Sequence, residues 1–183
     1  MWTWMAAFVT ASETARLVGH KSTGDVRATA ALVTFGVVGL GAVGCWLGGR
    51  YADRLGRTIV TSWAMAVSAV CCLAAGAVFA APLAVLGPVL AVWGIAVVAD
   101  SAQFSTAVSE LAPRDYVGTA LTLQTCFGFL LTTVTISLLP LLASAAGWRW
   151  SMSALAPGPI LGVVAMMALR RRPEAIRLAN GKR

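Results

Sequence analysis

The sequence contains a run of 42 consecutive residues, 58–99, without an acidic or basic side chain. As one helix this run would measure about 63 Å, whereas the hydrocarbon core of a bilayer is about 30 Å thick. The run must therefore form two membrane-spanning helices, and we expect the break between them at Ala81 and Pro82.

Three further runs without charged side chains, 28–49, 116–148 and 150–169, contain 22, 33 and 20 residues. Each can form a helix that crosses the bilayer, which takes about 20 apolar residues. Charged residues make up 11% of the 183 residues, whereas soluble domains carry about 25%. This composition argues against a soluble globular enzyme and predicts a polytopic helical membrane protein.

We expect an all-α transmembrane bundle of six helices in a single domain, residues 1–169, followed by a basic cytoplasmic tail at residues 170–183 that frays. The first apolar stretch, Met1 to Ser12, is too short to span a bilayer, so the first helix is shortened. Pro157 and Pro159 should kink the last helix. The expected helices cover residues 1–18, 28–48, 58–80, 83–109, 116–142 and 150–169, with a charged loop at 49–57.

Basic residues divide unequally between the two sides of this bundle. One side holds ten and the other holds four, Arg16, Lys21, Arg27 and Arg149. Because cytoplasmic loops are enriched in lysine and arginine, the first side should be cytoplasmic, which places both ends of the chain there and the helices in the plasma (inner) membrane. The net charge of +7 is explained by these loops, so we expect the lipid bilayer and no nucleic acid as a partner. The ten basic residues are Arg50, Arg54, Arg57, Arg114, Arg170, Arg171, Arg172, Arg177, Lys182 and Arg183.

Residues that carry enzyme chemistry are scarce. The four cysteines lie inside apolar runs, the only histidine is His20, and no set of carboxylates or metal ligands converges. We therefore expect no catalytic residue, no metal and no cofactor. Gly39, Gly41 and Gly44 match a dinucleotide-binding pattern, but they lie within an uncharged run and not after a strand, so we expect them, with Gly48, to let helices pack closely.

The segment 49–57 reads GRYADRLGR. It resembles the G-x-x-x-D-R-x-G-R signature of the major facilitator superfamily, with Gly49, Asp53, Arg54, Gly56 and Arg57 at the fixed positions. In that family the signature lies in the cytoplasmic loop between the second and third helices of a six-helix half. The resemblance implies a secondary transporter that moves a small solute by alternating access, in which these five residues form a conformational latch and do not bind substrate.

The chain is most similar to the carboxyl-terminal half of family members. Segments 99–105, 118–124 and 147–150 resemble helices ten to twelve, and the first helix is cut at Met1. The resemblance implies half of a major facilitator fold, built as a 3+3 inverted repeat. Its partner would be an amino-terminal six-helix half or a second copy of the chain. The alternative is a truncated fragment of such a transporter without independent activity, and the sequence does not select a solute.

Two polar residues within the fourth expected helix are candidates for transport and coupling. Asp100 is flanked on both sides by long apolar stretches, and Gln103 follows three residues later on the same helix face. Because a carboxyl group inside a bilayer is costly, it is a functional candidate by default. Asp100 could carry a proton in a symport or antiport cycle or orient a polar substrate together with Gln103. Alternatively, it could bond to a neighbouring helix.

Aromatic and hydroxyl residues suggest further contacts. Trp4, Phe8 and Trp93 lie on helices that line the central cavity in the family, although packing against lipid or protein is the alternative. Glu13 and Arg16, three residues apart, are expected to form an ion pair. The threonines of the fifth helix are expected to pack helices, because small hydroxyl residues do so in membranes.

Overall fold

The computed structural model describes residues 1–17 and 23–181. Residues 18–22 and 182–183 lie outside this description. The expected end of the first helix at Val18 falls in the undescribed part, as do four of the charged or polar residues discussed above: His20, Lys21, Lys182 and Arg183.

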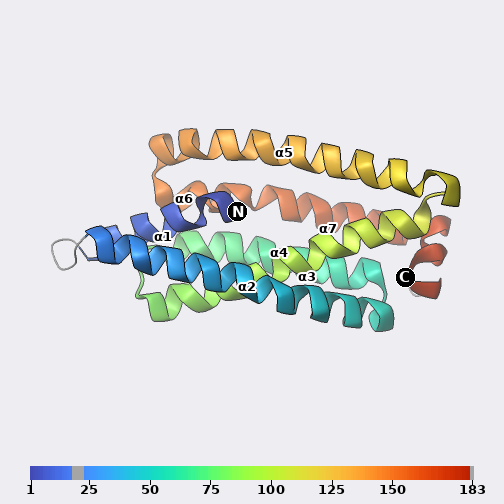
Figure 1. The fold of residues 1–183 in the computed structure, drawn as a ribbon, viewed down its shortest axis with the longest axis horizontal. Coiled ribbons are helices and arrows are strands. Elements are labelled where there is room, and N and C mark those ends of the chain that lie inside the picture. The colour runs from blue at the N-terminus through green and yellow to red at the C-terminus, as the bar shows by residue number, and fades with distance from the viewer. Residues whose placement is uncertain (18–22, 182–183) are drawn as a thin grey trace.

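The described residues form helices and no β-strand. Their order along the chain is shown in Figure 1. The elements are α1 (Trp2–Arg16), α2 (Thr23–Leu55), α3 (Arg57–Ala77), α4 (Leu83–Leu111), η1 (Arg114–Tyr116), α5 (Val117–Ala146), α6 (Trp148–Ser151), η2 (Ser153–Leu155), α7 (Pro157–Arg170) and η3 (Pro173–Gly181).

Five helical segments are long and apolar enough to cross a membrane: Thr23–Leu55, Arg57–Ala77, Leu83–Leu111, Arg114–Ala146 and Trp148–Arg170. The helix α1 has 15 residues and is about 22 Å long, which is shorter than the bilayer core. The structure confirms an all-α bundle with several helices that are long and apolar enough to span a membrane. Six crossings and an inverted repeat stay predictions.

The helices α2 and α4 approach closely along a row of glycines. A Cβ atom added at Gly44 would collide with the backbone carbonyl of Ile95, and one added at Gly48 would lie 3.2 Å from the carbonyl oxygen of Ala99. Hydrogen in place of a side chain therefore allows this contact. The prediction that the glycine pattern packs helices is confirmed at these positions.

The core lies where α1, α3 and α4 meet. Met5, Phe8 and Leu90 are fully buried, and Trp93 is 1% exposed. The indole nitrogen of Trp93 donates a hydrogen bond of 3.0 Å to the hydroxyl of Ser68, so the polar atom of this large side chain is satisfied inside the core.

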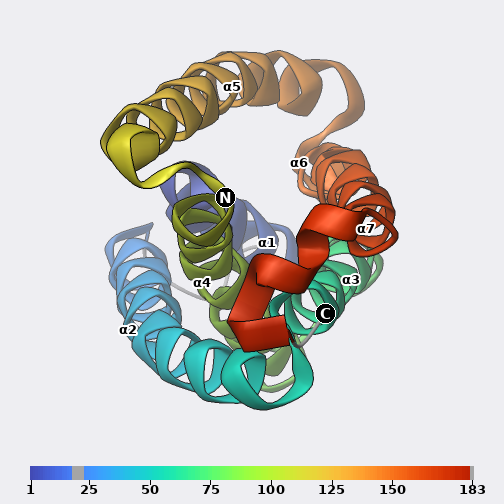
Figure 2. The same ribbon diagram turned by 90° about the vertical axis from the view of Figure 1, so that its right-hand side faces the viewer.

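The helix α5 stands apart from the other helices for much of its length, as the end view in Figure 2 shows. Of its 30 residues, only Leu139 and Ala143 are buried. Near these residues, the indole nitrogen of Trp4 donates a hydrogen bond of 3.1 Å to the carbonyl of Ile136. The expectation that the threonines of this helix pack against other helices is wrong within this bundle, because exposed residues such as Thr122 and Thr133 donate to carbonyls of their own helix.

Several boundaries differ from the expected ones, most of all at the end of α2, in the last helix and in the tail. The helix α2 continues to Leu55, so most of the expected charged loop is helical. The last expected helix is interrupted by η2, and α7 begins at Pro157, where proline fits because the first helical turn needs no N–H donor. The tail does not fray over its described residues. It folds into η3, in which Ala175 and Leu178 are fully buried.

Candidate functional site

A single residue, Gly56, separates α2 from α3. Its φ of +99° lies in a region that side chains disfavour, so glycine is the residue that permits this sharp reversal. The turn places Arg57 in the first turn of α3, where it is 9% exposed and faces α4. The sequence thus buries a guanidinium group at one end of the bundle, which we call the Arg57 end.

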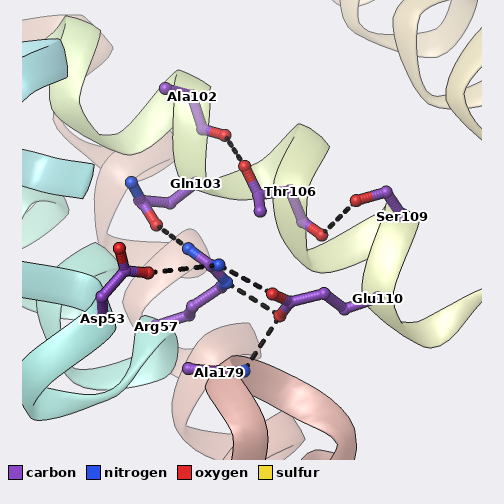
Figure 3. A network of polar contacts seen from close by, with 8 residues as sticks. All are labelled: Asp53, Arg57, Ala102, Gln103, Thr106, Ser109, Glu110 and Ala179. Carbon is purple, nitrogen blue, oxygen red and sulfur yellow. Dashed lines mark hydrogen bonds and ion pairs between the residues drawn. The ribbon is translucent and has the colours of Figure 1, made fainter. Parts of the chain in front are cut away.

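The guanidinium of Arg57 binds two residues of α4, as Figure 3 shows. Its Nε and Nη2 atoms donate to the two carboxylate oxygens of Glu110 at 2.8 and 2.7 Å, and Nη1 donates to Oε1 of Gln103 at 3.0 Å. Asp53 on α2 is a weaker partner, with 3.4 Å between its Oδ1 and Nη2 of Arg57 and a side chain 69% exposed. The bidentate pair with Glu110 is the strong arm, because two parallel charge-assisted bonds fix both groups.

The C-terminal segment joins the same carboxylate. The backbone N–H of Ala179 donates a hydrogen bond of 3.0 Å to Oε2 of Glu110. The buried side chains of Ala175 and Leu178 form a small apolar cluster with Ala107 of α4. In Figure 2, η3 crosses the end of the bundle in front of α4. We call Asp53, Arg57, Gln103, Glu110 and Ala179 the Arg57 network, and it connects α2, α3, α4 and η3.

The signature residues do not all join this network. Asp53, Gly56 and Arg57 meet at the turn, whereas Arg54 is exposed, and a Cβ added at Gly49 would meet no atom within 4 Å. The structure therefore gives a local reason for three of the five residues. A latch function for all five stays a prediction.

Asp100 and Gln103 are separated in the structure, although they share a helix. Gln103 is 2% exposed and bound to Arg57. Asp100 is half-buried, and its Oδ1 accepts a hydrogen bond of 3.1 Å from the hydroxyl of Ser101. Gln103 thus belongs to the Arg57 network, and the coupling role of Asp100 stays a prediction.

The aromatic candidates have different surroundings. Phe8 packs edge-on against Phe79 with 5.3 Å between ring centroids, and Trp93 is buried against Ser68. Trp4 lies between helices, with its ring centroid 6.1 Å from that of Trp148. Their role in lining a cavity stays a prediction.

An ion pair near the other end of the bundle is confirmed. Nη2 of Arg16 lies 2.9 Å from Oε2 of Glu13, as expected for residues three positions apart on a helix. The Glu13 side chain is 3% exposed, so the pair belongs to the core side of α1.

A hollow of about 450 Å³ with mixed polar and apolar walls lies between α4 and α5. Within it, Nε2 of Gln124 donates a hydrogen bond of 3.4 Å to the hydroxyl of Ser105. Oε1 of Gln124 is buried and has no hydrogen-bond partner among the described residues. Its lining includes hydroxyl, amide and aromatic groups: Ser101, Phe104, Ser105, Gln124, Thr125, Gly128, Phe129 and Thr132.

Sequence reasoning missed Glu110 and Ala179. Glu110 lies just beyond the expected helix 83–109, whereas the structure places it in the last turn of α4. One signal was present, because Glu110 follows Gln103 by seven residues and so lies two turns further along the same face. No local pattern marks Ala179, whose role depends on where the chain folds back.

No curated protein and no solved structure matches this chain. The family model described as Major Facilitator Superfamily matches residues 2–183, which is nearly the whole chain. This match agrees with the five candidate membrane spans and with the signature at the Gly56 turn. The chain therefore belongs to the major facilitator superfamily, whose members are membrane transporters of small solutes.

Proposed function

We propose that this chain is the carboxyl-terminal six-helix bundle of a secondary transporter, which moves a small solute by rocking against a second bundle. The observation that carries the proposal is the open face of α5. Only two residues of this helix are buried, and it presents Gln124, Thr125 and Thr132 to the hollow beside α4. Polar side chains inside a membrane usually face a bundle interior or a water-filled path, and lipid would leave Oε1 of Gln124 without a partner. A second bundle that closes over this face would complete a solute site between the two.

The Arg57 network would act as the latch of this bundle. Its strong arm, the bidentate pair with Glu110, holds the ends of α3 and α4 together, and Ala179 adds η3 to the same carboxylate. The exposed Asp53 is held at a longer distance and is the member that could exchange partners when the bundles move. The network would thus stabilise one arrangement of the Arg57 end, and an exchange of partners by Asp53 would allow a second arrangement.

Asp100 is our candidate for proton coupling. Among the described residues, its carboxylate accepts from the hydroxyl of Ser101 and pairs with no cation. Glu110, by contrast, is bound by a guanidinium group, which stabilises its charged form. Asp100 can therefore gain and lose a proton without breaking an ion pair, whereas Glu110 cannot.

We place the protein in the plasma (inner) membrane, with the Arg57 end in the cytoplasm. The basic residues Arg50, Arg54, Arg114 and Arg177 lie on segments at this end, and Arg27 and Arg149 on segments at the other. This asymmetry follows the bias of lysine and arginine toward cytoplasmic loops.

The test is solute-dependent proton movement in proteoliposomes that enclose a pH-sensitive dye. The chain is reconstituted alone and with a co-expressed amino-terminal bundle, and sugars, amino acids, organic cations and inorganic anions are added in turn under a pH gradient. We expect one class of solute to move protons. Asp100→Asn should abolish this response, whereas Asp115→Asn, which changes an exposed acid in η1, should leave it intact.

The outcomes separate the parts of the proposal. If no solute moves protons or enters the vesicles in either preparation, the carrier function is wrong for this bundle. If a solute enters equally in wild type and Asp100→Asn, the carrier function stands and the coupling role of Asp100 is refuted.

A further inference from the structure

An apolar groove of about 390 Å³ runs between α2 and α3, and α4 forms its floor. No charged side chain lines it. Its walls are formed by Leu47, Tyr51 and Leu55 of α2 and by Ile59, Trp63 and Val67 of α3.

The groove runs along the helices for a length that fits within one leaflet of the bilayer. The helices α2 and α3 meet at Gly56, so the groove starts at this turn and runs toward the middle of the bundle. From Leu55 to Leu47, and from Ile59 to Val67, the helix axis rises by about 12 Å. One leaflet contributes about 15 Å of hydrocarbon, half of the bilayer core. A chain lying parallel to the helices would therefore stay within one leaflet.

Two basic residues flank the groove: Arg54 lies beside the turn, and Arg50 lies one helical turn further along α2. Arg50 and Arg54 are exposed and alternate along α2 with the groove residues Tyr51 and Leu55. Among the described residues, Arg54 forms no ion pair with a carboxylate. Arg50 lies over the ring of Trp46, at 5.9 Å from its centroid.

This end of the groove also has the composition of a membrane interface. Tyr51, which lines the groove one helical turn before Leu55, is 49% exposed, and such an amphipathic ring is typical of the headgroup level. Arginines at this level attract anionic headgroups. The charge at the rim and the apolar groove below it therefore suit the two parts of one amphipathic molecule.

A neighbouring protein helix could cover the apolar walls, but it would also have to bring acidic side chains to Arg50 and Arg54 to match the charge of the rim. A free inorganic anion could bind the arginines but would leave the apolar walls without an occupant.

We propose that this groove and its basic rim form a site for one anionic phospholipid. One acyl chain lies between α2 and α3, and the phosphate pairs with Arg54 and Arg50. The site does not depend on which solute the protein carries, because it lies on the face of α2 and α3 and not in the hollow between α4 and α5.

The test measures lipid binding to the full chain in detergent by native mass spectrometry, with phosphatidylglycerol, phosphatidylcholine and inorganic phosphate as separate probes. The variant R50Q/R54Q removes the rim, and Ala64→Leu fills the groove from α3 while keeping both arginines. The matched control, R171Q/R172Q, removes two exposed positive charges at the end of α7.

We expect one tightly bound phosphatidylglycerol, and binding about 30-fold weaker in R50Q/R54Q, given the usual contribution of a basic residue near an anionic surface. Ala64→Leu should also weaken it, and R171Q/R172Q should not. The proposal is overturned if phosphatidylcholine binds equally well, if the rim variant binds as wild type does, or if phosphate alone competes fully. Displacement of the lipid by an amino-terminal bundle would also overturn it, because the groove would then be a protein contact.

Discussion

Replacing Glu110 with glutamine removes the charge that holds Arg57 in the bundle. Glutamine has nearly the same size, but its amide group would point a donor at the guanidinium where a carboxylate oxygen now accepts. Two charge-assisted bonds, at 2.8 and 2.7 Å, lose their anionic acceptor, and Asp53 at 3.4 Å remains as the counter-charge. The variant therefore leaves a guanidinium whose side chain is 11% exposed without a close anion.

The magnitude follows from the burial of the two partners. Breaking a fully buried pair costs about 3–5 kcal/mol, whereas an exposed pair contributes about 0–1 kcal/mol. The Glu110 side chain is 25% exposed, so we expect a loss of about 2–3 kcal/mol. For a chain of this size, 1 kcal/mol changes the melting temperature by about 2–4 °C, which predicts a decrease of about 4–12 °C.

Thermal unfolding of the purified protein in detergent measures this decrease, and Asp53→Asn is the matched control. Asp53 also pairs with Arg57, but its side chain is 69% exposed, so its neutral variant should melt within about 4 °C of wild type. Hydrogen exchange should also accelerate in the described tail, residues 173–181, for Glu110→Gln only. Equal changes in melting temperature for the two variants would refute the assignment of Glu110 as the strong arm.

Three further predictions concern other contacts. Ala179 has a φ of +45°, so Ala179→Gly should stabilise the docked tail by about 1 kcal/mol. Ala179→Pro removes the N–H that donates to Glu110 and should make the tail sensitive to protease, and equal cleavage of the two variants would contradict this. Gly44→Ala should lower the free energy of unfolding by about 1–3 kcal/mol because the added Cβ meets the carbonyl of Ile95, whereas Gly39→Ala, whose Cβ meets no atom within 4 Å, should leave it unchanged. Equal effects in thermal unfolding would show that α2 and α4 are not in close contact. Trp4→Phe should lose about 1 kcal/mol and free the middle of α5, seen as faster hydrogen exchange there, and unchanged exchange would mean that the indole hydrogen bond does not hold this helix.

The membrane-spanning character of the chain could be predicted from its sequence because it depends on local composition. A run such as 58–99 argues against a soluble fold whatever the arrangement of the helices in space. The Glu13–Arg16 pair and the close approach at Gly44 were predictable for the same reason, since both follow from spacing along one helix. The signature itself was readable, because its residues are contiguous.

The extension of α2 to Leu55 is not predicted from the sequence, because the charged segment 49–57 is interpreted there as a loop. Nothing between Gly49 and Leu55 breaks a helix, and arginine side chains can reach the interface from a helix that continues beyond the apolar core. The first residue that stops the helix is Gly56, with its positive φ.

The partners of Arg57 could not be read from local patterns. Glu110 lies 53 residues further along the chain and Ala179 lies 69 residues beyond Glu110, so their meeting depends on how α3, α4 and η3 are arranged. The burial of Leu178 likewise requires the apolar surface that Ala107, Leu111 and Leu169 form together. The charged residues are therefore visible in the sequence, whereas the pairing of Arg57 with Glu110 is not.

The hydrogen bond from Trp4 to Ile136 has a consequence for how the protein is made. The two residues are 132 positions apart, so at 5–20 residues per second the ribosome needs about 7–26 s after Trp4 to supply its acceptor. During this interval the indole group of Trp4 has no acceptor on α5. The early helices must therefore assemble before this hydrogen bond can form. A pause in translation before Ile136 would lengthen the time in which other membrane proteins could bind Trp4 instead.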